Sequence, residues 1–88
     1  MKIKEGFILR TICGEHVVVG EGLAQVNFNK MLSLNESAAW LWQEVSGKDF
    51  SREELVQLLL CRYEVSLEQA SADVDKLVDT WIKEGVVE

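Results

Sequence analysis

The chain has 88 residues, 48% of them hydrophobic, with three tryptophans and no proline, a composition that predicts one compact domain over residues 1–88 and excludes a disordered or low-complexity chain. Its formal charge of −6 is uneven: Lys and Arg number 4 against 5 Asp and Glu in residues 1–44, and 5 against 10 in residues 45–88. Such a surface repels phosphate backbones and anionic lipid headgroups, so nucleic acid and membranes are poor partners.

The first two predicted elements are strands. Residues 7–13 and 16–19 are rich in β-branched and aromatic side chains. Gly14 and Glu15 between them suit a two-residue turn with glycine first, which predicts a β-hairpin. Further on, apolar residues alternate from Val26 to Leu34, with a turn or bulge at Asn29 and Lys30. This alternation predicts a third strand that ends at Leu34.

Three helices follow, each with a recognisable first residue. Asn35 is a favoured N-cap, and apolar residues at helical spacing continue from it toward Gly47. Ser51 and Ser66 each begin a capping box, which predicts the start of the second and third helices. The predicted core residues of these helices are Ala38, Leu41, Trp42 and Val45, then Leu55, Leu58 and Leu59, then Ala70, Val74, Leu77 and Trp81.

No pattern of residues predicts catalysis, a cofactor or a metal. His16 is the only histidine and has no cysteine or carboxylate at ligand spacing nearby. Cys13 and Cys61 share no spacing motif and follow no secretory leader, so we expect two reduced thiols in the core of a cytoplasmic protein. No apolar run is long enough to span a bilayer. We therefore expect a protein that is not an enzyme.

The order of these elements resembles the PqqD family, the peptide-recognition modules of ribosomal peptide modification pathways. The likeness covers about residues 5–87 and depends on residues 31–42, 51–55 and 81–87. It implies an α+β, winged-helix-like domain in which an N-terminal three-stranded antiparallel sheet is followed by a three-helix bundle. It also implies a non-catalytic module that presents the leader segment of a precursor peptide to a modifying enzyme, often a radical-SAM enzyme.

The resemblance further implies that the leader binds by β-strand addition to the third strand, in a groove walled by the third helix. The residues expected to contact the peptide are Met31, Leu32, Ser33, Leu34, Ser71, Asp75, Val78 and Ile82. Proline at Leu32, or at whichever strand residue donates to the peptide, should weaken binding and leave the helices intact.

Two other functions remain open at this level. A β-ribbon beside three helices also occurs in winged-helix DNA-binding regulators. Acidic residues dominate the polar positions of the third helix, which opposes DNA binding. An open strand could instead pair with a second copy and form a homodimer.

Overall fold

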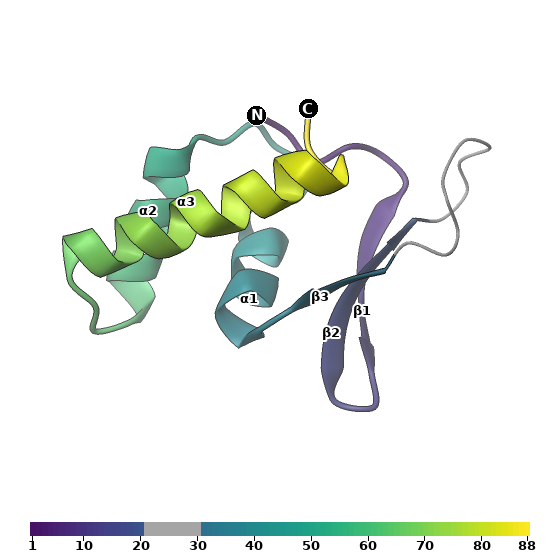
Figure 1. Cartoon of the computed structure of the whole chain (residues 1–88), viewed down its shortest axis with the longest axis horizontal. Coiled ribbons are helices and arrows are strands. Elements are labelled where there is room, and N and C mark those ends of the chain that lie inside the picture. Colours follow the sequence, from purple (N-terminus) through teal and green to yellow (C-terminus); the bar gives the residue numbers. More distant parts are fainter. Residues whose placement is uncertain (21–30) are drawn as a thin grey trace.

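A computed structural model describes residues 1–20 and 31–88 of the chain. A three-stranded antiparallel sheet with strand order β1-β2-β3 is followed by three helices (Figure 1). The elements are β1 (Phe7–Ile12), β2 (Glu15–Gly20), β3 (Met31–Leu34), α1 (Glu36–Val45), α2 (Arg52–Arg62) and α3 (Leu67–Glu84). This arrangement confirms the predicted α+β fold. The predicted alternation from Val26 and the turn or bulge at Asn29 and Lys30 lie outside the described residues.

The hairpin between β1 and β2 turns one residue earlier than predicted. Ile12 pairs with Glu15, so the two turn residues are Cys13 and Gly14, whose φ angles are 52° and 80°. Positive φ at both positions is what a type I′ turn requires, and this turn matches the twist of the strands. Cys13 therefore lies at the exposed hairpin tip. Cys61 is exposed as well, and both thiols are free, so the prediction of core cysteines is wrong.

All three predicted N-caps are present. The Asn35 side chain accepts a hydrogen bond from the Ala38 N–H at 2.8 Å. Ser51 and Ser66 accept from the N–H three residues further on, at 3.2 and 3.1 Å. Each cap satisfies one of the N–H groups that a helix start leaves without an intrahelical acceptor, so short polar side chains fix where the helices begin.

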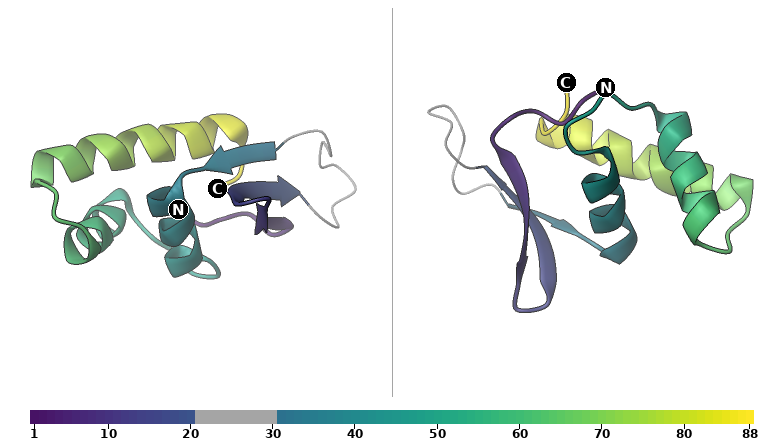
Figure 2. Two further views of the ribbon diagram at one scale, coloured as in Figure 1. Left: turned by 90° about the horizontal axis from the view of Figure 1, so that it is seen from below. Right: turned by 180° about the vertical axis from the view of Figure 1, so that it is seen from behind.

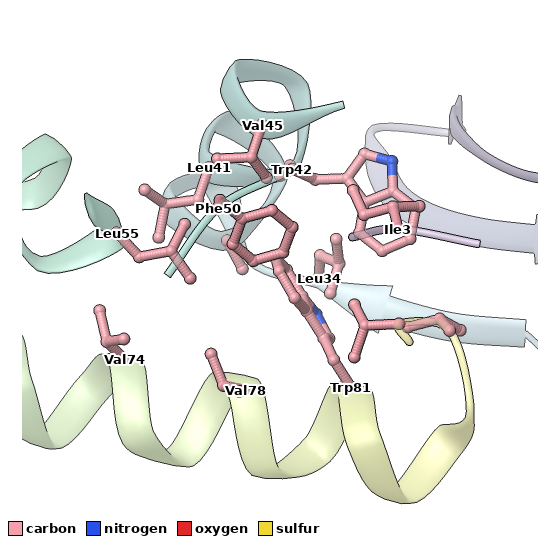
Figure 3. Close-up of a cluster of buried hydrophobic side chains, with 14 of the residues drawn as sticks. Ile3, Leu34, Leu41, Trp42, Val45, Phe50, Leu55, Val74, Val78 and Trp81 are labelled. Atoms are coloured by element: carbon pink, nitrogen blue, oxygen red, sulfur yellow. The ribbon is translucent and has the colours of Figure 1, made fainter. Parts of the chain in front are cut away.

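Trp81 of α3 occupies the centre of the core (Figure 3). It is fully buried and meets Trp42 and Phe50 edge to face, with ring centroids 5.3 and 6.2 Å away. Aromatic rings prefer this geometry because the positive edge of one faces the negative surface of the other. These contacts join α3 to α1 and to the segment before α2.

The buried face of α3 differs from the predicted one by a single residue. Val78, not Leu77, is fully buried with Ala70, Val74 and Trp81. Leu77 is only partly buried where it packs against this cluster. One residue along a helix is a rotation of about 100°, so this shift changes which face of α3 remains open. In α2, Val56 likewise replaces the predicted Leu58 as a buried residue.

The two ends of the described chain are joined near the end of α3 (Figures 1 and 2). Ile3 and Val87 form an antiparallel bridge, and the Lys4 N–H donates to the Val86 carbonyl at 2.9 Å. The Phe50 N–H also donates to the Met1 carbonyl at 2.8 Å. These bonds tie the end of α3 to the N-terminal segment and hold the helix in place beside the sheet.

Candidate functional site

β3 is an edge strand of the sheet. It pairs with β2 on one side only, and on the other side the described residues provide no fourth strand. α3 runs along the β3 side of the sheet (Figure 2, left). An edge strand presents backbone donors and acceptors that can pair with another extended chain. The important question is which residues of β3 present them.

The hairpin turn determines how the backbone groups of β2 are divided between its neighbours. Across a two-residue turn, the closing pair Ile12 and Glu15 must be a hydrogen-bonded pair. Hydrogen-bonded and non-hydrogen-bonded pairs alternate along an antiparallel ladder. Glu15 and Val17 therefore direct their N–H and C=O groups to β1, whereas His16 and Val18 direct theirs to β3.

The same alternation assigns the backbone of β3. Leu34 pairs with His16 and Leu32 pairs with Val18, so both leucines use their N–H and C=O groups on β2. The N–H and C=O of Ser33 consequently face the open edge. No described residue forms a hydrogen bond with them there. Ser33, rather than Leu32, is the strand residue placed to donate to an incoming peptide.

A hollow of about 320 Å³ lies between β3 and the helices. Four apolar side chains from three helices line it: Ala38, Leu41, Leu59 and Leu77. Leu32, Ser33 and Leu34 line it on the strand side, and Asp73, Lys76 and Thr80 add polar groups from α3. We call this hollow the β3–α3 groove. An open backbone edge beside an apolar groove is the arrangement that β-strand addition needs, because main-chain pairing supplies affinity and pockets select alternate side chains.

α3 presents one face to the groove. Asp73, Lys76, Leu77 and Thr80 follow the spacing of three and four residues that places side chains on one helical face. Leu77 is the one apolar member and is only partly buried in the free protein.

The structure brings together only part of the predicted site. Leu32, Ser33 and Leu34 line the β3–α3 groove, and Met31 belongs to the same strand. None of the four predicted residues of α3 lines that groove. Ser71 and Asp75 line a separate hollow between α2 and α3, Val78 is 0% exposed in the core, and Ile82 is 54% exposed.

Sequence reasoning missed Lys76 and Leu77 as groove residues. The sequence predicts Leu77 in the core stripe, because helical spacing alone fits Leu77 and Val78 equally well. One signal in the sequence could have indicated the groove. Leu77 is an apolar residue on a helical face whose other members, Asp73, Lys76 and Thr80, are polar.

Two of the acidic residues of α3 are compensated away from the groove. The Arg52 guanidinium bonds the carboxylates of Asp75 and Asp79 at 3.0 and 2.8 Å. The hydrogen bonds that Arg52 donates to Asp79, and then those to Asp75, raise the pKa of Arg52 above its ordinary value. These ion pairs link the start of α2 to α3, and Arg52 balances part of the negative charge of α3 outside the groove.

Within residues 1–20 and 31–88, no three His, Cys, Asp or Glu side chains gather as metal ligands would. The same part of the chain includes no helix with the length and apolar character to cross a membrane.

Comparison with known families agrees with this geometry. Residues 15–87 match the family described as Coenzyme PQQ synthesis protein D (PqqD). The chain belongs to the PqqD family. A solved structure of TbiB1 in complex with the TbiA(beta) leader peptide has a similar fold, with a TM-score of 0.76 and 17% sequence identity, over 100% of this chain and 95% of that chain. The comparison with curated proteins finds no match.

Proposed function

We propose that this PqqD-family domain binds the leader segment of a ribosomally made precursor peptide as a fourth strand on β3 and presents it to a modifying enzyme. In this proposal the domain itself does no chemistry. The observation that carries the proposal is the Ser33 backbone, which no described residue pairs with and which faces an apolar groove. Family membership and the leader peptide bound to the structurally similar TbiB1 support it.

We propose that the peptide pairs antiparallel with β3, as the neighbouring strands of the sheet do. The peptide residue opposite Ser33 exchanges two backbone hydrogen bonds with it and points its side chain to the same side as the Ser33 side chain. The residues before and after it lie opposite Leu32 and Leu34 and point into the groove. Two peptide side chains, two positions apart, therefore contact Leu77 and its apolar neighbours.

The proposed peptide site consists of Leu32, Ser33 and Leu34 on the strand and Lys76 and Leu77 on α3. Met31 is included because the alternation turns its backbone outward as well. Contact by Ser71, Asp75, Val78 and Ile82, which the resemblance implies, stays a competing prediction. The same binding assay tests it, because substitution of these residues would then weaken peptide binding.

The test is a titration of the protein with the labelled leader segment of the precursor peptide encoded nearest to its gene. Leu77→Asp should reduce binding by at least about tenfold, because a charge is buried against the peptide's apolar side chains. Leu67→Asp is the matched control, since it makes the same change on an exposed leucine of the same helix outside the groove. Unchanged binding by Leu77→Asp would contradict the proposed site.

The two other functions make different predictions. DNA binding by α3 predicts a shift of DNA in a low-salt gel assay, and the acidic surface predicts that none occurs. A homodimer through β3 would occupy the same edge as the peptide. Light scattering with and without leader peptide tests for such a homodimer, because a peptide that binds to β3 should dissociate it into monomers.

A further inference from the structure

Lys76 differs from the other polar side chains of the β3–α3 groove in its positive charge. It projects from the α3 face that also carries Asp73, Leu77 and Thr80, and it is exposed to solvent. No described carboxylate lies within ion-pairing distance of its ammonium group. It is the only cationic side chain among the groove residues that the structure describes.

The neighbouring polar groups are already engaged inside the protein. The Asp73 carboxylate accepts from the Gln69 amide at 2.9 Å, and the Thr80 hydroxyl donates to the Lys76 carbonyl at 2.9 Å. Asn35 accepts both from the Ser37 hydroxyl and from the Ala38 N–H. Among the charged side chains that line the groove, the Lys76 ammonium is therefore the one without a hydrogen bond or ion pair to any described residue.

The positive charge of Lys76 matters because the protein as a whole is negatively charged. The chain carries a net charge of −6, so an acidic peptide meets general repulsion as it approaches. A carboxylate is tolerated best where a local cation compensates it. Lys76 and Ser33 line the same groove. Because a strand advances about 3.4 Å per residue and a lysine side chain extends about twice that distance, we expect Lys76 to meet a peptide residue within about two positions of the one opposite Ser33.

We propose that Lys76 is a specificity residue that selects peptides carrying Asp or Glu at one position within two residues of the Ser33 partner. This inference depends on the proposed peptide site and adds the charge of the ligand. The opposite preference, for a basic residue, would point to Asp73, whose carboxylate accepts one hydrogen bond from Gln69 and keeps its charge, and it is a contrary outcome of the test below.

The test selects ligands from a phage-displayed library of random 12-residue peptides. The library is panned in parallel on the wild type, on Lys76→Glu and on Lys48→Glu, the last being the same charge change on a lysine that lines a different hollow beside α2. We expect Asp or Glu to be enriched at one fixed position for the wild type and for Lys48→Glu. For Lys76→Glu that position should favour Lys or Arg.

Affinities of one selected peptide then measure the interaction. Replacing its acidic residue by Asn or Gln should weaken binding to the wild type by up to about fivefold, the range of exposed ion pairs. The same replacement should have no effect on Lys76→Met, which keeps the aliphatic stem without the charge. The preference should also fade at high salt.

The possible results distinguish a failure of the role proposed for Lys76 from a failure of the proposed function. Peptides enriched without an acidic position, or with an acidic position that survives in Lys76→Glu, would overturn the role of Lys76 and leave the peptide site standing. If the library yields no peptide that binds at β3, the proposed function is overturned together with the role of Lys76.

Discussion

Leu77 and Val78 are adjacent in the sequence but belong to different surfaces. Val78 is fully buried against the core, whereas Leu77 lines the β3–α3 groove. The sequence could show that α3 has an apolar stripe, and it did predict Ala70, Val74 and Trp81 in the core. It could not choose between Leu77 and Val78, because that choice depends on how the helix is rotated against Trp42 and Phe50, which are distant in the chain.

This difference predicts opposite effects for two similar substitutions. Val78→Ala should lower the free energy of unfolding by about 1–3 kcal/mol, because it removes buried methyl groups and leaves a cavity, and it should leave peptide affinity nearly unchanged. Leu77→Ala should cost less stability and weaken peptide binding more. Urea unfolding and fluorescence anisotropy with a labelled peptide measure the two quantities. Equal effects on binding would contradict the assigned helix face.

At the scale of elements, local signals in the sequence were enough for the helix starts. Ser51, Ser66 and Asn35 cap the helices as predicted because a cap depends only on residues within one turn. The predicted hairpin turn differs from the observed one by one residue. The reason is that Cys13 adopts a positive φ angle, which its residue type does not favour. The correct turn also decides which backbone groups of β3 are open.

The strand alternation gives a direct prediction for proline substitutions. Ser33→Pro removes an N–H that faces the open edge, so the fold should persist while peptide affinity falls by at least about tenfold through the lost hydrogen bond and the bulk of the ring. Leu32→Pro removes an N–H that β2 uses and should destabilise the sheet. Circular dichroism and calorimetric titration distinguish the two. The assignment fails if Leu32→Pro is the better tolerated variant.

The cap of α3 offers a test of stability without function. Ser66→Ala should lower the free energy of unfolding by about 1 kcal/mol, because the Gln69 N–H loses its acceptor. Ser66 does not line the β3–α3 groove, so peptide affinity should remain the same. Chemical denaturation and peptide titration of the same sample check both parts, and a large loss of affinity would mean that the site extends to the start of α3.

At the scale of the whole molecule, the order of strands and helices could be predicted because each element has its own sequence signal and the series resembles one family. The groove could be predicted only in outline. Its strand side follows from the position of β3, but its helical side depends on contacts between α1, α2 and α3 that no local pattern encodes. The bridge between Ile3 and Val87 is equally non-local.

A peptide that binds only the folded domain should stabilise the whole domain. At a free concentration of 100 times its Kd, the selected peptide should raise the free energy of unfolding by about 2.7 kcal/mol. Thermal denaturation at several peptide concentrations measures this effect. With binding about tenfold weaker or more, Ser33→Pro should keep no more than about 1.4 kcal/mol of this stabilisation at the same peptide concentration. A wild-type unfolding transition that does not shift when peptide is added would count against binding to the folded state.

The most direct measurement is amide hydrogen exchange by NMR on the free and peptide-bound protein. The strand alternation predicts that the Ser33 N–H exchanges rapidly in the free protein and becomes protected when peptide binds, while Leu32 and Leu34 are protected in both states. A Ser33 N–H that is already protected in the free protein, or that stays unprotected with peptide bound, would contradict strand addition at β3.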